Sequence, residues 1–359
     1  MKRLLMIILS LSMVCTIFAY PAMAADTTSV PLKTSYVTAS GQQVSHITFN
    51  NTAKTTLDSL TRAKQNMAAL GFEQDWIDTL SEEEILDYAD IEDAIITTSF
   101  FKLRALTDEE QITRQYYEDN NLMDEYIDPR EFEVIPESQY INETEIAPLT
   151  SKGIDNGYIT VTATSVKYSS NPKNYKLSGR YEWTKMPTNR YTDYFAVSHS
   201  SGITEYPDTF YSVTKHSFDH YDWVYQDSGS IKKTKNNTKS YVDKIDTEAK
   251  GNGTWEHAGP GGYAITHTLH KDFTPSLSHP GTTGIQEVYY GYKGYLAYDI
   301  YISNPTQPWG FNTYATLQHQ YKTVVTGLSI SIPLGGSLSL TPQSSFKNAD
   351  SAINTSYTP

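Results

Sequence analysis

The sequence predicts an α+β protein in which a small acidic helical N-terminal segment is followed by an antiparallel β-sandwich or barrel-like domain. The first observation is a change of period: apolar residues follow helical spacing from residue 51 to about 126 and alternate with polar ones from about residue 157 onward. The second is charge. Residues 73–145 hold 23 acidic and four basic residues, whereas residues 146–359 hold 16 acidic and 18 basic residues.

The first 24 residues have the layout of a secretory signal peptide. Lys2 and Arg3 precede an apolar run that ends at Ala22-Met23-Ala24, which places small residues where a signal peptidase cleaves. We therefore expect a secreted protein, extracellular or associated with the cell wall, that is cut after Ala24. The single cysteine lies within residues 1–24, so the mature chain would contain no disulfide, thiolate metal site or cysteine nucleophile.

The next part of the chain is expected to be first extended, over residues 25–50, and then helical, over residues 51–126. Two capping boxes, beginning at Ser81 and Thr107, mark helix starts, because the hydroxyl and the glutamate three residues later can each accept a backbone hydrogen bond. The acidic residues of these first turns are favoured there by the helix dipole. The apolar stripe of the helix that begins at Ser81 is expected to continue through Ile95.

Residues 127–156 contain prolines among acidic and polar residues and are expected to form a linker or strap. Beyond this segment, short alternating stretches recur about every ten residues and are separated by Gly, Pro, Asn and Ser clusters. Strands joined by turns without intervening helices predict an antiparallel β domain over residues 157–359.

The stretch KHSFDHYDW, residues 215–223, is the first candidate for chemistry, because neutral imidazole is the commonest metal ligand in proteins. His216 and His220 are four residues apart, which places them on one face of a strand or helix, and they are the candidate metal ligands. The aromatic content favours a strand, and histidines on a half-exposed sheet face are the simpler interpretation. His267 and His270, three apart, would point to opposite faces of a strand and could not share an ion without a bulge.

Tyrosine is the second unusual feature: 20 of 28 tyrosines lie between residues 158 and 321. Tyrosine offers a large amphipathic contact area at low entropic cost, so Tyr289, Tyr290 and Tyr292 are candidate ligand-binding residues. Trp309, among prolines and a glycine, is a fourth candidate. The alternative is that these rings are good strand formers that pack across neighbouring strands.

Familiar catalytic motifs are missing. No G-x-S-x-G elbow or phosphate-cradling glycine loop occurs, and the serine context Asp227-Ser228-Gly229 lacks its flanking glycines. Paired carboxylates could act in glycoside hydrolysis, with candidates in the β half, but sequence cannot place two of them at the required separation. The candidate carboxylates are Glu182, Asp193, Glu256 and Asp299.

Two stretches carry a resemblance: LGFEQDWIDTLSEEEILDY (70–88) and YEWTKMPTNRYTDYFAVSH (181–199). Their combination of an acidic helical segment with a β-rich half resembles uncharacterised secreted proteins of low-GC Gram-positive bacteria. The resemblance implies secretion by such a cell, and it carries over no functional residue.

The leading hypothesis is a secreted, non-enzymatic β-rich protein that presents a tyrosine-rich surface to an extracellular protein, a cell-wall polymer or a glycan. No cofactor is expected. Nucleic acid is disfavoured as a partner because the net charge is −13 and phosphate binding needs a concentrated basic surface. No stretch after the signal is long and apolar enough for a transmembrane helix. The alternatives are a pore-forming or membrane-acting toxin and a metal-dependent hydrolase that uses the histidine cluster.

Overall fold

The protein is described here by a computed structural model. The described residues are 31–49, 58–122, 125–126, 128–146, 157–170, 174–187, 190–206, 209–245, 261–303, 309–321, 329–333, 339–341 and 346–357. The expected signal peptide, residues 1–24, lies outside them, so cleavage and secretion stay predictions.

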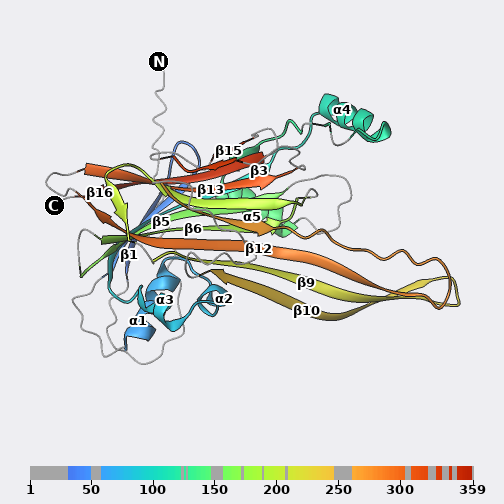
Figure 1. Cartoon of the computed structure of the whole chain (residues 1–359), viewed down its shortest axis with the longest axis horizontal. Helices are drawn as coiled ribbons and strands as arrows, with labels where there is room; N and C mark the ends of the chain where they lie inside the picture. Colours follow the sequence, from blue (N-terminus) through green and yellow to red (C-terminus); the bar gives the residue numbers. More distant parts are fainter. Residues whose placement is uncertain are drawn as a thin grey trace, which may run out of the picture.

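Most of the described chain is antiparallel β-sheet, which confirms the expected β-rich protein (Figure 1). The larger sheet has ten strands in the order β1-β2-β3-β5-β6-β12-β9-β10, with β4 on β3 and β8 on β12. These strands are β1 (Leu32–Val37), β2 (Gln43–Thr48), β3 (Ile91–Leu103), β4 (Phe132–Ile135), β5 (Tyr158–Tyr168), β6 (Asn174–Lys185), β8 (Ile203–Glu205), β9 (Tyr211–Tyr225), β10 (Ile231–Ile245) and β12 (Thr283–Ile302).

A second sheet has four strands in the order β11-β7-β13-β16, and a small hairpin pairs β14 with β15. These strands are β7 (Thr192–His199), β11 (Gly262–Thr268), β13 (Trp309–Gln320), β14 (Ser329–Ser331), β15 (Ser339–Thr341) and β16 (Phe346–Tyr357). The four-stranded sheet and the ten-stranded sheet share one apolar core, in which Leu177 of β6 lies with Phe195 of β7 and Leu317 of β13. Alternation along each strand supplies these inward-facing side chains.

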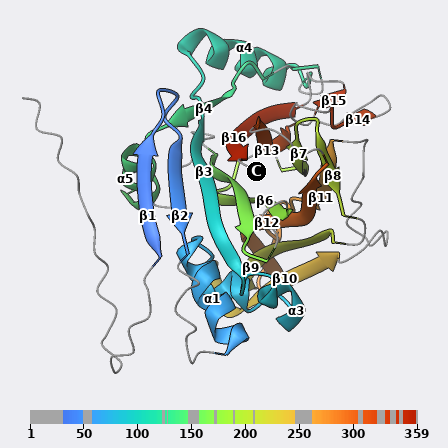
Figure 2. The same ribbon diagram turned by 90° about the vertical axis from the view of Figure 1, so that its left-hand side faces the viewer.

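Three short helices cover one end of the large sheet (Figure 2). They are α1 (Ser59–Ala69), α2 (Gln74–Ile77) and α3 (Glu82–Leu86), and we call them the helical unit. A second apolar core lies beneath them, where Phe72 packs edge-on against Tyr88 and Tyr295 at ring-centroid distances of 5.7 and 5.3 Å. Gly71 ends α1 with a φ of 79°, a left-handed conformation that glycine adopts without strain.

The remaining helices are α4 (Asp108–Asp119) and α5 (Glu137–Ile146). Both expected capping boxes are present, at Ser81 for α3 and at Thr107 for α4. The expectation that helix continues through Ile95 is wrong, because residues 91–103 form β3 in the middle of the large sheet. The run Ile91–Leu103 is rich in β-branched and aromatic residues, and burial on both faces removes the alternation that marks a strand.

Two other segments contain more regular structure than was expected. Residues 32–48 form the β1–β2 hairpin at one edge of the large sheet, rather than a separate extended segment. Part of the expected linker, residues 127–156, forms β4, which pairs with β3, and then α5. Pro129 and Pro136 lie outside the strand and helix themselves, which is compatible with regular structure between and after them.

Beyond the body, β9, β10 and the first part of β12 continue as a three-stranded extension (Figure 1). We call β9, β10 and residues 283–290 the arm. Residues 231–244 of β10 are exposed throughout, because β10 is the free edge of the sheet. On β12 the register shifts between Tyr290 and Lys293, so a bulge lies where the arm joins the body.

Ion pairs attach the helical unit to the base of the arm. Asp75 of α2 accepts hydrogen bonds from Lys293 Nζ at 2.7 Å and from Lys215 Nζ at 2.9 Å. Arg180 of β6 donates to the carbonyl oxygens of Gly71 and Leu70 at 2.7 and 3.1 Å. The Arg180 contacts satisfy carbonyl groups at the C-terminal end of α1. Together with the Asp75 contacts, they join the helical unit to β6, β9 and β12, which are distant from it in sequence.

The Asp75 attachment gives a pH-dependent prediction. Burial raises the pKa of this carboxyl group, but the hydrogen bonds from Lys293 and Lys215 outweigh it and lower the pKa from 3.8 to about 2. A lowered folded-state pKa stabilises the fold above the unfolded pKa, and this contribution is lost as the pH falls from 3.8 toward about 2. Asp75→Asn should therefore be less stable than wild type at neutral pH, and urea denaturation should show the difference shrinking over that acid range. A difference that is independent of pH would contradict the assignment.

The packing of the two sheets gives a second prediction, at Gly179 of β6. A Cβ atom there would lie 2.6 Å from Val197 Cγ2 and 2.7 Å from Phe195 Cζ on the facing sheet. Gly179→Ala should therefore lower the free energy of unfolding by about 1–3 kcal/mol through overpacking, as measured by urea denaturation. Gly310→Ala in β13 is the control, because the nearest atom to its Cβ would lie at 3.3 Å, and it should cost less. Equal losses would contradict the prediction.

Candidate functional site

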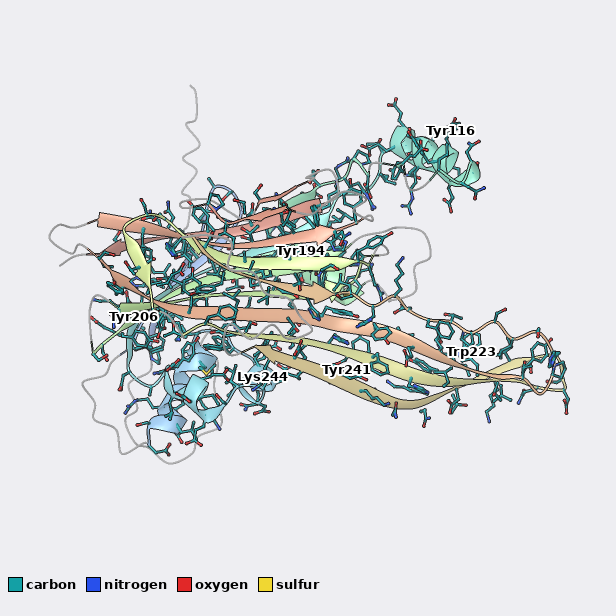
Figure 3. The ribbon with its side chains drawn as sticks, viewed as in Figure 1. Tyr116, Tyr194, Tyr206, Trp223, Tyr241 and Lys244 are labelled. Atoms are coloured by element: carbon teal, nitrogen blue, oxygen red, sulfur yellow. The ribbon has the colours of Figure 1, made fainter. Side chains whose placement is uncertain are left out.

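A cavity of about 730 Å³ lies where the arm leaves the body, and we call it the ring pocket. Its aromatic wall consists of His216, Tyr241, His270 and Tyr289, and threonines supply hydroxyl groups around them. Figure 3 shows Tyr241 on β10 at the base of the arm. The full set of lining residues is Thr192, Tyr194, Thr214, His216, Tyr241, Val242, Asp243, Thr266, His267, Thr268, His270 and Tyr289.

Strand register brings these side chains together. His216 lies directly opposite Tyr241 of β10, and Phe218, two residues further along β9, lies opposite Tyr289 of β12. Residues directly opposite each other share a face of the sheet, so β9, β10 and β12 present these rings to the same side. The third element is β11, whose pairing with β7 carries His267 to this place from the four-stranded sheet.

The His216 ring is the centre of the wall. It stacks on Tyr292 with ring centroids 4.8 Å apart and an interplanar angle of 14°. The rings of His270, Tyr241 and His267 follow, with centroids at 5.2, 5.4 and 5.7 Å. Rings from three strands and one loop thus surround a single imidazole.

Hydrogen bonds fix the deeper histidine. The Tyr181 hydroxyl group lies 2.6 Å from His267 Nδ1, and His267 Nε2 lies 3.4 Å from His216 Nδ1. The backbone N–H of His270 donates to the Tyr292 hydroxyl oxygen at 2.8 Å. Tyr181 and Tyr292 are buried in the core. The packed interior, rather than solvent-exposed groups, therefore positions His267 and His270.

Burial keeps two of the imidazoles neutral. Desolvation lowers the pKa of His216 to about 4, with a further contribution from the nearby His270. The pKa of His267 is lowered to about 3 by its nearly complete burial and by His216 and His270. Near neutral pH these rings therefore carry no charge, and each can act as both a hydrogen-bond donor and an acceptor. Asp243 is the one lining residue of the pocket with a carboxylate.

The predicted residues fall in different places. His216 and Tyr289 line the ring pocket. His220 shares the face of His216 on β9, as expected for a strand, but its ring lies further out along the arm, with Asp222 at 3.7 Å and Glu287 at 3.9 Å. The structure therefore does not bring His216 and His220 together. Within the described residues, no three His, Cys, Asp or Glu side chains are arranged to hold a metal ion.

The other predicted tyrosines do not line the cavity. Tyr292 is fully buried behind His216, where it supports the wall. Tyr290 lies opposite Ser217 on the other face of the arm, and its hydroxyl group donates to Asp219 at 3.1 Å. The backbone of Trp309 begins β13 opposite Tyr357, whereas its side chain lies outside the described part of the structure.

Sequence reasoning missed Tyr241, His267 and His270. His267 and His270 were expected on opposite faces of one strand, but β11 ends at Thr268, so alternation no longer governs His270. Both rings therefore approach His216 without a bulge. The available signal was the concentration of histidines after residue 199, and that signal does not say which strands meet.

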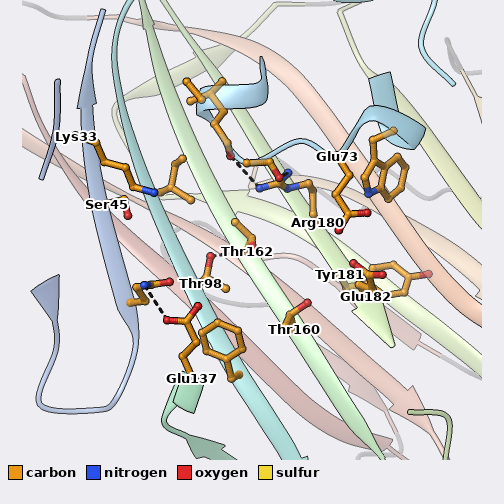
Figure 4. A pocket seen from close by; sticks show the side chains of 17 residues that line it. Lys33, Ser45, Glu73, Thr98, Glu137, Thr160, Thr162, Arg180, Tyr181 and Glu182 are labelled. Atoms are coloured by element: carbon orange, nitrogen blue, oxygen red, sulfur yellow. Dashed lines mark hydrogen bonds between the residues drawn. The ribbon is translucent and has the colours of Figure 1, made fainter. Parts of the chain in front are cut away.

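A second cavity, of about 410 Å³, crosses the outer face of β2, β3, β5 and β6 next to the helical unit (Figure 4). Thr98 and Thr162 form its floor, with hydroxyl oxygens 3.1 Å apart, and Glu73 and Glu182 lie at one end. Burial raises the pKa of Glu182, and the ammonium group of Lys293 opposes this shift. This cavity is polar and lacks the exposed rings of the ring pocket.

The carboxylates considered for hydrolysis do not converge. Asp193 is fully buried and accepts hydrogen bonds from Trp183 Nε1 at 2.7 Å and from His319 Nδ1 at 2.8 Å. Asp299 forms an ion pair with Lys176 at 2.8 Å and lies opposite it in the pairing of β12 with β6. Glu182 lies opposite Lys293, toward the other end of the same pairing. Glu256 lies outside the described residues.

No protein-family model matches the chain, and no curated protein matches it. Among solved structures, the chain is similar to a pore forming protein at 10% identity and a TM-score of 0.22, covering 57% of this chain and 88% of that one. It is also similar to the Clostridium perfringens NetB toxin in its membrane inserted form at 7% identity and a TM-score of 0.20, covering 55% of this chain and 88% of that one. A third similarity is to the Clostridium perfringens delta-toxin at 12% identity and a TM-score of 0.16, covering 58% of this chain and 84% of that one.

At these TM-scores the similarities support no argument about fold or function. Among the described helices, none has the length and apolar character needed to cross a membrane.

The buried histidines give a prediction that nuclear magnetic resonance can check. The imidazole signals of His216 and His267 should keep their neutral-form shifts on acidification until the pH approaches about 4 and about 3, because burial disfavours the charged form. His216→Gln and His267→Gln would assign the two signals. Midpoints near the ordinary histidine value of 6.5 would show that these rings are hydrated and that the pocket wall is not built as described.

Proposed function

We propose that the protein is a secreted, non-enzymatic binding protein that holds an uncharged glycan in the ring pocket. The observation that carries this proposal is the aromatic wall around His216, open to solvent and lined with hydroxyl groups. Its volume of about 730 Å³ lies within the usual range of about 300–1,000 Å³ for small-ligand sites.

The chemistry of the wall selects the ligand class. A sugar ring presents an apolar C–H face and a rim of hydroxyl groups, so it needs an aromatic surface and hydrogen-bonding groups that both donate and accept. Tyr241 and Tyr289 supply aromatic surface, and their rigid rings lose little entropy on binding. The neutral imidazole of His216 and the threonine hydroxyls supply donors and acceptors.

Charge argues against an acidic ligand in the same place. Two of the three histidines are held neutral by burial, and Asp243 would repel a phosphate or carboxylate. An uncharged polysaccharide therefore suits the pocket better than an anionic cell-wall polymer. This narrows the sequence-based hypothesis, which left protein, cell-wall polymer and glycan open.

The alternative functions have less support from the described residues. A metal-dependent hydrolase needs converging ligands, and His216 and His220 lie apart along the arm. A membrane-acting toxin stays a prediction. Lys233 and Lys235 on one face of β10 and Lys232 and Lys239 on the other would be costly to place against lipid, so neither face of the β9–β10 hairpin favours it in this form.

Binding to a panel of uncharged glycans, measured by calorimetry with the mature protein, tests the proposal. We expect at least one glycan of the panel to bind. Its dissociation constant should rise roughly tenfold or more in Tyr241→Ala and in Tyr289→Ala, because each change removes an aromatic contact. The matched control is Tyr36→Ala, which truncates an exposed tyrosine on β1, far from the pocket.

Two outcomes would overturn the proposal. One is the absence of binding to any uncharged glycan in the panel. The other is a bound glycan whose affinity is unchanged in both pocket variants, or is lowered equally by Tyr36→Ala. Preferential binding to anionic polymers would likewise contradict the assignment of a neutral ligand.

A further inference from the structure

Helix α4 stands apart from the rest of the molecule. None of its residues is buried, and Figure 3 shows Tyr116 on this helix well away from the body. It is held by the Thr107 capping box and by Arg104, whose guanidinium group contacts both Glu110 carboxylate oxygens at 2.8 Å. A helix of 12 residues is marginal in water by itself, and the Tyr117 ring packs against Tyr126 at a centroid distance of 5.6 Å, which leaves the other faces of α4 for a further contact.

The exposed surface of α4 combines apolar and acidic groups. Ile112 and Tyr116 lie one turn apart on the same face and are 72% and 60% exposed. The helix contains five acidic residues and one arginine, a formal charge of −4. Glu118 and Asp119 lie at its C-terminal end, where negative charge is disfavoured by the helix dipole. A partner for this face should therefore be basic and partly apolar.

The arm carries such a surface on the face opposite the ring pocket. The five lysines of β10 are divided between its two faces, and Lys232 and Lys239 lie on the pocket face. On the face away from the pocket, Lys233 and Lys235 lie opposite Trp223 and Tyr221 of β9. The rings of Tyr221 and Trp223 are half-buried there, and that of Tyr290 is exposed. We call this surface the outer arm face, and it consists of Tyr221, Trp223, Lys233, Lys235 and Tyr290.

The outer arm face has charge that α4 could complement. Lys233 Nζ lies 3.9 Å above the Tyr221 ring centroid, and no carboxylate within ion-pair distance of it is found among the described residues. Lys235 is paired with Asp219 at 2.8 Å. A 15-residue strand rises about 50 Å, whereas a 12-residue helix is about 18 Å long, so α4 fits on the face with room to spare.

Within one molecule the two surfaces lie on opposite sides. Figures 1 and 2 share a vertical axis, and in both views α4 lies at the top of the molecule whereas β10 lies below the body. We propose that α4 of one copy docks on the outer arm face of a second copy of this chain. Because two different surfaces meet, the contact is heterologous, and each added copy leaves one α4 and one arm free for the next.

Sedimentation velocity over a concentration series tests the contact with the full mature chain. Wild type should associate as its concentration rises. Glu118→Lys with Asp119→Lys, and separately Lys233→Glu with Lys235→Glu, should each raise the dissociation constant roughly tenfold or more, because like charges then face each other. Raising the salt concentration to about 1 M should weaken wild-type association through screening.

The decisive variant carries all four reversals in one chain. It restores opposite charges across the contact with their signs exchanged, so association should return to within about threefold of wild type. The matched control, Lys232→Glu with Lys239→Glu, changes the net charge equally but on the pocket face of β10, and it should associate like wild type. Circular dichroism and thermal melting of each variant would exclude misfolding as the cause of a loss.

Several results would overturn the proposal. Wild type that stays monomeric at every concentration would do so, as would a four-reversal chain that fails to recover. An equal loss in the control variant would show a general charge effect rather than this contact. Compaction that does not depend on concentration would place α4 on its own arm. Because glycan binding is measured separately and uses the other face of the arm, either proposal can fail alone.

Discussion

Strand β12 is the constraint on which the rest of the structure depends. Its later part pairs with β6 in the body, and its earlier part pairs with β9 in the arm. Gly294 lies at this junction because a Cβ atom there would lie 2.2 Å from the Tyr181 ring. Its two neighbours hold the helical unit: Lys293 binds Asp75, and the Tyr295 hydroxyl group contacts that of Tyr88. One strand thus fixes the positions of body, arm and helices.

Many of the abundant tyrosines serve as polar members of the core rather than as surface. Tyr181, Tyr292, Tyr295 and Tyr298 are essentially fully buried, and each hydroxyl group has a hydrogen-bond partner. A buried hydroxyl group needs such a partner, so each of these hydroxyl groups helps to fix the position of the group that it bonds to. Tyr181 and Tyr292 position the histidines of the ring pocket. The core and the pocket are therefore one packed unit, and a tyrosine-dense sequence does not by itself indicate a binding face.

Alternation along the arm separates two surfaces of different character. Tyr289 faces the ring pocket, whereas Tyr290, its neighbour in sequence, lies on the outer arm face. Because successive side chains of a strand point to opposite faces, a single three-stranded element can present the ring pocket on one side and the outer arm face on the other. The two proposed interactions are compatible for this reason.

The sequence by itself determined what depends on neighbours along the chain: the two capping boxes, the strand that contains residues 215–223 and the residues that share its faces. Strand β3 was not predicted from the sequence, because burial on both faces removes the alternation of apolar and polar residues that marks a strand. Only the tertiary structure decided that β11, paired with β7, would place His267 beside His216, and that Tyr292 would be buried. Period and capping are local properties, whereas the meeting of strands from two sheets depends on packing between residues far apart in sequence.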